Sequence, residues 1–203
     1  MTKVYGQWLV AAIVSSGAMS AFAQANAPLQ DASVGQLIEQ LSAEGGAVAK
    51  GFRPTRKPDA SDRCSTAADS GNRATKILVV EYADDSAPQV SLAIRFNLNS
   101  DELNLGDKLL LDKLAQALLS PQLQNARFAV AGHTDTSGDE RSADHNPRLS
   151  CARALSALRY LVGKGVKEDR LTAYGFGSKR LLSGLAGTAP DHRRVEIRRA
   201  PSS

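Results

Sequence analysis

The sequence contains few aromatic residues, few cysteines and no strong excess of either charge. Phe, Trp and Tyr make up 5% of its 203 residues, which is sparse for the base-stacking surfaces that bind single-stranded nucleic acid. The formal net charge is only +4 at pH 7, and no RNA- or DNA-binding motif accompanies the arginines near the C-terminus. The composition therefore argues against nucleic acid as a partner. With 42% hydrophobic and 23% charged residues, it fits one globular domain with extensions.

The two cysteines, Cys64 and Cys151, permit at most one disulfide bond. In an exported chain such a bond would close a long loop and stabilise the fold by roughly 4 to 5 kcal/mol in the chain-entropy treatment. The alternative is two separate thiols, with Cys151 packed into its helix as a small hydrophobic side chain. The sequence leaves both arrangements open.

Long hydrophobic runs are scarce, and the clearest one extends from Trp8 to Ala23. Lys3 precedes it, and Ala21-Phe22-Ala23 has the form of a signal-peptidase site, so residues 1–23 are interpreted as a signal peptide. The run is shorter than the span of about 20 apolar residues that crosses a bilayer. We therefore expect an exported, periplasmic chain without a transmembrane segment in its mature part.

Residues 24–75 are interpreted as an N-terminal extension, and residues 76–203 as the folded domain. Within the extension, apolar residues at helical spacing between Val34 and Leu41 predict a short amphipathic helix. By default this helix packs on its own domain; the alternative is that residues 33–43 recruit an envelope protein partner. Residues 51–71, rich in Arg, Lys, Pro, Asp and Ser, have the composition of a linker.

The remaining pattern predicts an α/β (α+β) two-layer sandwich with β-α-β-α-β-β order and a mixed sheet, preceded by the extension. Expected strands and helices lie at 77–82, 90–96, 109–118, 127–131, 147–162, 170–176 and 195–197. The second helix is expected to bury Leu149, Ala152, Leu155, Leu158 and Val162. The last strand is expected to run antiparallel at the edge of the sheet or beside it.

The central motif combines an acid after a strand with a base on the following helix. Asp135 follows the apolar run ending at Ala131, and Arg153 lies in the second turn of the helix that begins near Pro147. Asn146 is a good N-cap residue for that helix. Because a carboxylate pairs with ammonium and a guanidinium binds a carboxylate in bidentate fashion, the two suit a small zwitterion such as an amino acid.

At these positions the sequence resembles the C-terminal domain of OmpA-like proteins, from about Val90 to Arg198. The matching residues are Gly132-His133-Thr134-Asp135, Gly138, Asn146, Leu149-Ser150, Arg153-Ala154, Gly165-Val166, Arg170-Leu171, Gly175, Gly177 and Arg193-Arg194-Val195-Glu196. The resemblance implies non-covalent peptidoglycan binding, with Asp135 and Arg153 holding the diaminopimelate of the stem peptide. It implies a pocket lined by Arg193, Asn146, Thr134, Leu149 and Asn97.

The chain departs from the family pattern at two places near this site. The loop at 139–145 is longer than usual, which bears on ligand choice, and His192 replaces the usual asparagine before Arg193. By the resemblance the protein is not an enzyme, needs no cofactor and is tethered to the cell wall in the periplasm or associated with the outer membrane.

Two alternatives remain open at the level of sequence. A secreted cell-wall hydrolase would use His133 and Asp135, with or without a metal, and Ser150 supplies a third residue type of a hydrolytic triad. However, the three histidines lack metal-ligand spacing, and Ser150 lacks a nucleophile-elbow setting. The second alternative is an assembly module of an envelope complex, in which the domain only tethers and the N-terminal helix recruits.

Overall fold

The computed structural model describes residues 28–43, 63–64, 88–94, 96–97, 99–137 and 145–200. Four features predicted from the sequence lie wholly or mostly outside these ranges. They are the signal peptide at 1–23, most of the linker at 51–71, the β-rich run at 77–82 and most of the loop at 139–145.

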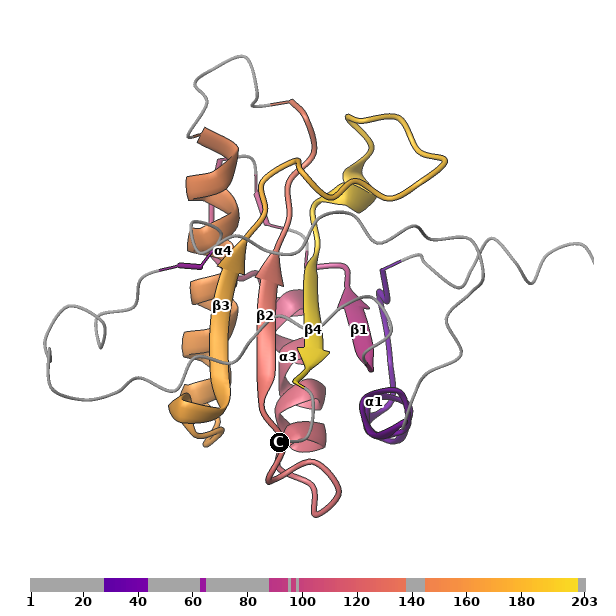
Figure 1. Cartoon of the computed structure of the whole chain (residues 1–203), viewed down its shortest axis with the longest axis vertical. Helices are drawn as coiled ribbons and strands as arrows, with labels where there is room; N and C mark the ends of the chain where they lie inside the picture. Colours follow the sequence, from indigo (N-terminus) through magenta and orange to yellow (C-terminus); the bar gives the residue numbers. More distant parts are fainter. Residues whose placement is uncertain are drawn as a thin grey trace, which may run out of the picture.

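A four-stranded mixed sheet, in the order β1-β4-β2-β3, forms the centre of the domain (Figure 1). The strands are Gln89–Leu92 (β1), Phe128–Gly132 (β2), Leu171–Gly175 (β3) and Val195–Arg199 (β4). β2 and β3 are parallel, whereas β4 is antiparallel to both β1 and β2. The other elements are the helices α3 (Leu105–Leu118) and α4 (His145–Gly163) and the 3-10 helices η2 (Glu168–Arg170) and η3 (Pro190–His192). With α3 and α4 packed together on one face, the predicted two-layer fold and element order are confirmed.

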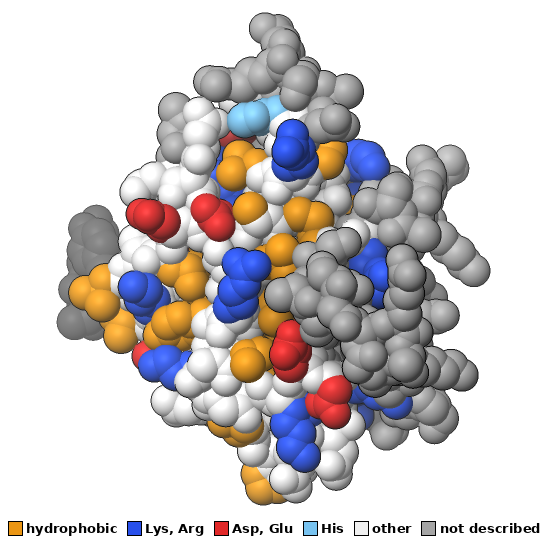
Figure 2. All heavy atoms as spheres, turned by 90° about the vertical axis from the view of Figure 1, so that its left-hand side faces the viewer, with side chains coloured by type: hydrophobic (Ala, Val, Ile, Leu, Met, Phe, Trp, Pro, Cys, Tyr) orange, Lys and Arg blue, Asp and Glu red, His pale blue; other side chains and the backbone are white. Residues whose placement is uncertain are grey.

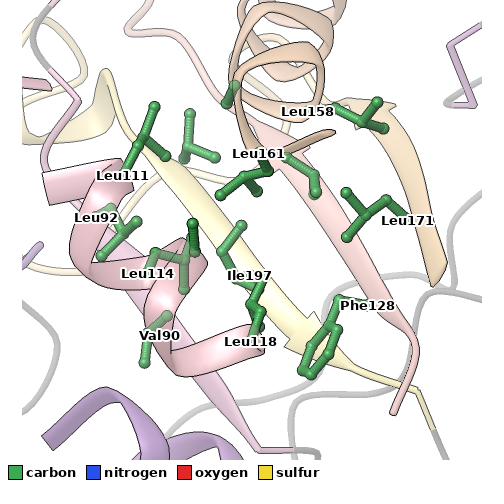
Figure 3. Packing of buried hydrophobic residues seen from close by; sticks show 14 of the residues in the cluster. Val90, Leu92, Leu111, Leu114, Leu118, Phe128, Leu158, Leu161, Leu171 and Ile197 are labelled. Atoms are coloured by element: carbon green, nitrogen blue, oxygen red, sulfur yellow. The ribbon is translucent and has the colours of Figure 1, made fainter. Parts of the chain in front are cut away.

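The hydrophobic core lies between that face of the sheet and the two helices. Figure 3 shows leucines of the helices meeting apolar side chains of the strands: Leu111, Leu114, Leu118, Leu158 and Leu161 against Val90, Phe128, Leu171 and Ile197. Most are almost completely removed from solvent, and each such side chain stabilises the fold by about 1.5 to 3 kcal/mol. α3 begins at a capping box in which Asn104 and Asp107 bond each other's backbone N–H groups, and this fixes its start.

The face of α4 that packs on the sheet differs from the predicted one. Of the five residues expected to be buried, Leu158 is buried and Leu155 and Val162 are partly buried against the core. The other buried positions are Asn146, Ser150, Arg153, Ala154, Ala157 and Leu161. The cause is a close approach of helix and sheet, since a Cβ atom added at Gly132 would lie 2.1 Å from the carbonyl oxygen of Ser150. Mostly small side chains therefore fit between α4 and β2.

Helix α1 (Val34–Ser42) packs into the same core, which confirms the default prediction for it. Leu37 and Leu41 are fully buried, and α1 contacts both α3 and β1. Just before it, Leu29 pairs with β1 and so widens the sheet by one short bridge. The apolar face of α1 is therefore occupied within the domain.

β4 lies inside the sheet, between β1 and β2, and the prediction of an edge position is wrong. Val195 and Ile197 belong to the main core, whereas Glu196 and Arg198 alternate with them and are also buried. Arg198 Nη2 donates to Glu196 Oε2 at 3.3 Å. Since the buried charges are paired, an inner strand tolerates the alternation of apolar and charged residues that is typical of a half-exposed strand.

Cys64 and Cys151 form a disulfide bond, with Cα atoms 5.5 Å apart. The N–H of Cys64 donates to the carbonyl of Ala173 at 3.0 Å, so the segment 63–64 lies along the outer edge of β3. Gly175 makes room for the bond, because a Cβ there would lie 2.7 Å from Cys151 Sγ. The disulfide thus fastens the N-terminal part of the chain to α4.

Figure 2 shows the surface on the β3 side of the molecule. Among the described side chains of this face, lysines and arginines are spread between hydrophobic, polar and acidic ones rather than gathered in one place. A concentrated basic patch of the kind that attracts polyanions is therefore not a feature of the described part of this face. Of the helices in the described ranges, none has the combined length and hydrophobicity needed to cross a bilayer.

Candidate functional site

The turn after β2, which carries Asp135, is fixed by backbone hydrogen bonds to two other segments. Three of its N–H groups donate at 2.9 to 3.0 Å: His133 to Arg194, Thr134 to Gly177 and Thr136 to Gly187. Gly177 has a φ of +53°, a conformation that favours glycine. Because the residues on both sides of Asp135 are held in this way, its carboxylate has a defined direction.

Asp135 is 6% exposed, and each oxygen of its carboxylate has a partner. Oδ1 accepts from the N–H of Ser137 at 2.9 Å, and Oδ2 forms an ion pair with Nη1 of Arg193. Burial by itself raises the pKa of Asp135, but the hydrogen bonds from Arg193 and Ser137 outweigh it and lower the pKa. Asp135 is therefore ionised at neutral pH, with one oxygen capping its own turn and the other facing a cation.

Arg153 is 2% exposed and is held by the segment that precedes α3. Its Nε donates to the carbonyl of Ser100 at 3.1 Å and its Nη2 to that of Asn97 at 3.2 Å. The guanidinium also lies 5.1 Å from the ring centre of Phe96, a cation-π contact. Within the described residues the third nitrogen, Nη1, is buried and has no acceptor. Arg153 is thus fixed on two sides and has one unused donor group.

The charges of Asp135 and Arg193 both act on Arg153. The pKa of Arg153 is lowered to about 10, first by burial and then by the charge of Arg193, while Asp135 and Asp101 oppose this shift. Arg193 contacts Asp135 directly, and the charges of both act on Arg153 in opposite directions. The side chain of Arg193 is 36% exposed against 8% for that of Asp135, so Arg193 is the outer member.

Asn146 belongs to the site, but in a role different from the predicted N-cap. α4 already begins at His145, so Asn146 is a helical residue and is buried. Its side-chain Nδ2 donates to the backbone carbonyl of Asp135 at 3.1 Å. The amide therefore joins the start of α4 to the turn that carries the acid.

The other predicted residues lie around the same turn and helix. Thr134 is 2% exposed, and within the described residues its hydroxyl has no hydrogen-bond partner. Asn97 contributes its backbone carbonyl to Arg153, while the residue itself is exposed. Leu149 is half-buried about one helical turn before Arg153. Asn97 thus contacts the guanidinium of Arg153 through its backbone. Thr134 directly precedes Asp135 in the chain.

His133 lies beside the buried ion pairs that Glu196 forms with Arg194 and Arg198. Its Nε2 lies 3.5 Å from Glu196 Oε1, and Arg194 donates to the same oxygen through Nε and Nη2 at 2.9 and 2.6 Å. Burial alone raises the pKa of Glu196, but the neighbouring His133, Arg194 and Arg198 hold it well below its usual value. In the described ranges no three His, Cys, Asp or Glu side chains cluster in a way that could hold a metal ion.

The free energy of unfolding is expected to fall as the pH drops from 7 to 4. Burial and then the charge of Arg194 lower the pKa of His133 from 6.5 to about 4. Below pH 6.5 the unfolded chain therefore binds a proton that the folded protein takes up only near pH 4, which destabilises the fold by about 3 kcal/mol over this window. The lowered pKa of Glu196 acts in the same direction once the pH falls below 4.5.

Urea unfolding at pH 7 and pH 4.5 measures this effect in the wild type and in His133→Asn. The variant lacks the titrating imidazole, so we expect its stability to change much less between the two pH values. If wild type and variant lose the same amount, His133 does not cause the pH dependence.

Two contacts of the site were not foreseen from the sequence. Arg193 was expected to line the pocket, but its pairing with Asp135 joins residues 58 positions apart, and no local signal indicates it. The hydrogen bond from Arg153 Nε to the backbone carbonyl of Ser100 was not foreseen either, because every residue carries such a carbonyl and the sequence does not mark it. By contrast His192, noted as a departure from the family pattern, accepts from Leu182 N–H through Nδ1 and bonds Ala186 O through Nε2. It thereby fixes the loop that leads to Arg193.

Two surface cavities lie beside α3. One, of about 510 Å³, is lined by residues that include Asp101, Lys108 and Tyr160, and the other, of about 210 Å³, by residues that include Gln30 and Asp107. Neither is lined by the charged residues of the candidate site.

Comparison with known proteins points to one family. A family model described as the OmpA family matches residues 95–194, a range that contains all seven predicted site residues. Outer membrane protein P5 of Haemophilus influenzae is 37% identical over 130 residues, covering 55% of this chain and 35% of that protein. Outer membrane protein A of Serratia marcescens is 32% identical over 118 residues, covering 51% and 32%. The chain thus spans about a third of the length of these two relatives.

Two solved structures are similar to part of this chain. The OmpA-like domain of FopA1 from Francisella tularensis has a TM-score of 0.47 at 17% identity, covering 72% of this chain and 93% of that one. The periplasmic domain of Helicobacter pylori MotB has a TM-score of 0.46 at 22% identity, covering 59% and 84%. The family match, the motif residues and the relatives together show that residues 95–194 of this chain form an OmpA-family domain.

Proposed function

We propose that the protein binds peptidoglycan non-covalently through the diaminopimelate residue of the stem peptide, with Asp135 taking the ammonium and Arg153 the carboxylate. The OmpA-like domain family is known for peptidoglycan association in envelope proteins. One observation carries the finer proposal. An ionised, buried carboxylate lies near a buried guanidinium whose Nη1 has no acceptor among the described residues. A buried donor without a partner destabilises a site by about 1 to 3 kcal/mol until an acceptor arrives.

The strength of such a site suits a polymeric ligand. Charge-assisted hydrogen bonds contribute about 1.5 to 3 kcal/mol each, so a clamp on one amino-acid head implies a dissociation constant between about millimolar and micromolar. The wall presents the same stem peptide at high local density, so repeated weak contacts hold the protein there. In this proposal Asn146, Thr134, Leu149 and Asn97 line the site, and the protein is tethered to the wall in the periplasm.

The contacts of the remaining polar residues favour a binding protein over a cell-wall hydrolase. His133 is buried against Glu196, so it is not placed as a general base beside Asp135. Ser150 Oγ donates to Pro147 O and accepts from Gly177 N–H, both at 2.8 Å, so its hydroxyl joins the start of α4 to the loop after β3. The relatives are outer membrane proteins by name, which agrees with a non-enzymatic role.

Asp135→Asn is expected to reduce co-sedimentation with purified diaminopimelate-containing sacculi at least about tenfold. The asparagine keeps the size of the side chain and an oxygen for the Ser137 N–H, but it loses the charge that binds the ammonium. Arg153→Lys is expected to act similarly, because lysine cannot reproduce the planar fork of donors. Free diaminopimelate should compete with the wild type for sacculi.

Asp169 is an exposed carboxylate in η2, so Asp169→Asn is the matched control and should sediment like the wild type. Thermal unfolding of all three variants shows whether they remain folded at the assay temperature. Undiminished sedimentation of a folded Asp135→Asn protein would refute the assignment.

A further inference from the structure

The larger of the two cavities beside α3 is an open groove that the proposed stem-peptide site does not use. Its volume is about 510 Å³, which lies within the range of small-molecule binding sites. Residues before α3, in α3 and in α4 line it, among them Asp101, Glu102, Leu103, Lys108, Arg159 and Tyr160. The groove therefore lies where the start of α3 meets the middle of α4.

One wall of this groove is the chain segment that also holds Arg153. Ser100 accepts from Arg153 Nε through its carbonyl at 3.1 Å. The next residue, Asp101, accepts from the hydroxyl of Ser156 at 3.1 Å, which joins the segment to α4. Tyr160 lies seven residues after Arg153 on the same helix, which corresponds to about 10 Å along the helix axis. The groove and the proposed stem-peptide site are thus neighbours.

The charged side chains of the groove favour a neutral polar ligand. Asp101 and Glu102 supply carboxylates, and Lys108 and Arg159 supply cationic groups. Two acids and two bases leave no excess of charge that would attract an ion of either sign. Together they offer both acceptors and donors of hydrogen bonds. A ligand rich in hydroxyl and amide groups matches this combination.

The ring of Tyr160 adds an apolar surface whose position is fixed. Its hydroxyl donates to Asp112 Oδ1 at 2.9 Å, and Lys164 Nζ lies 5.1 Å from the ring centre. The residue is half-buried, so part of it stays accessible from the groove. A sugar ring has C–H groups that pack on an aromatic side chain and hydroxyls that bond carboxylates and guanidinium groups. The groove offers both kinds of contact.

We propose that this groove binds the glycan strand of peptidoglycan, at the N-acetylmuramic acid that carries the stem peptide. This inference rests on the proposed function and adds a second subsite to it. L-Ala and D-Glu separate that sugar from diaminopimelate. Since an extended residue spans about 3.3 to 3.6 Å, these two and the diaminopimelate side chain cover the distance of about 10 Å along α4. Sugar and peptide then bind as one ligand, and each raises the effective concentration of the other.

Two ligands that differ by the sugar test the subsite. They are the tripeptide L-Ala-γ-D-Glu-diaminopimelate and the same tripeptide attached to N-acetylmuramic acid. Calorimetric titration of the full mature protein gives both dissociation constants. We expect the wild type to bind the muramyl tripeptide at least about tenfold more tightly than the free tripeptide.

The double variant Glu102→Ala/Arg159→Ala removes one acid and one base from the groove, both at exposed positions. Its preference for the muramyl tripeptide is expected to shrink to about threefold or less, while its affinity for the free tripeptide stays that of the wild type. Lys167→Ala/Glu168→Ala removes the same pair of charges from exposed positions outside the groove and should keep the wild-type preference. Thermal unfolding shows that both variants are folded.

The outcomes separate this inference from the proposed function. Equal binding of both ligands by the wild type would refute the glycan subsite while stem-peptide binding stands. A preference that survives in the groove variant, or a groove variant that loses affinity for both ligands alike, would also refute it. If the wild type binds neither ligand, the proposed function fails and the inference fails with it.

Discussion

Loss of the disulfide between Cys64 and Cys151 is expected to lower the free energy of unfolding by about 4 to 5 kcal/mol. The bond joins residues with a sequence separation of 87, so its removal gives the unfolded chain much more conformational freedom. It also fastens the segment 63–64 to α4 beside β3. Urea denaturation of the oxidised wild type and of the double variant Cys64→Ser/Cys151→Ser measures the difference.

Reduction of the wild type provides the internal control for this measurement. Dithiothreitol should bring the wild type to the stability of the double variant and leave the double variant unchanged. A difference below about 1 kcal/mol between oxidised and double-variant protein would mean that the bond adds little to the fold.

Glu196→Gln is the second substitution for which we expect a large loss, of about 3 to 5 kcal/mol in the free energy of unfolding. Glu196 is a buried carboxylate on the inner strand β4, paired with the guanidinium groups of Arg194 and Arg198. The amide cannot neutralise these neighbours, so buried positive charge is left without its counter-ion. Chemical denaturation at pH 7 measures the loss.

Glu168→Gln serves as the matched control because Glu168 is an exposed carboxylate in η2. Removing the charge of an exposed acid changes stability by about 0.5 kcal/mol or less. Equal effects at the two positions would contradict the view that Glu196 balances the charges inside the sheet.

The parts of the fold with clear local signals were predicted well from the sequence. β2, β3, α3 and α4 follow from apolar periodicity and from the residues that interrupt it, and each lies close to its expected range. The position of β4 was not predictable in the same way. Its alternation of apolar and charged residues is typical of a strand with one solvent-exposed face. In the structure, however, Glu196 and Arg198 are buried and pair with each other.

The prediction of which α4 residues are buried was partly wrong for a related reason. Leu149 and Leu155 were expected to be buried but are only partly so, because Gly132 lets the helix approach the sheet so closely that mostly small residues fill the interface. The close approach joins two segments that are distant in sequence, so helical periodicity alone does not reveal it.

At the candidate site, the sequence identified the principal residues but not their partners. Asp135 and Arg153 stand out by their places after a strand and in the second turn of a helix, and by the resemblance to a known family. Asp135 pairs with Arg193, and Arg153 donates to the carbonyl of Ser100. Both contacts join residues more than 50 positions apart in the chain. The folded structure shows that the carboxylate of Asp135 pairs with Arg193 and that Arg153 is held by two backbone carbonyls.

The most direct test of the central claim is an NMR titration of the protein with the diaminopimelate tripeptide, following the guanidinium Nε–H signals and the backbone N–H of Ser137. The account predicts saturable shifts of the Arg153 and Arg193 signals together with Ser137, whose N–H bonds Asp135, and their loss in Asp135→Asn. Saturable binding that leaves these signals unchanged would contradict the account.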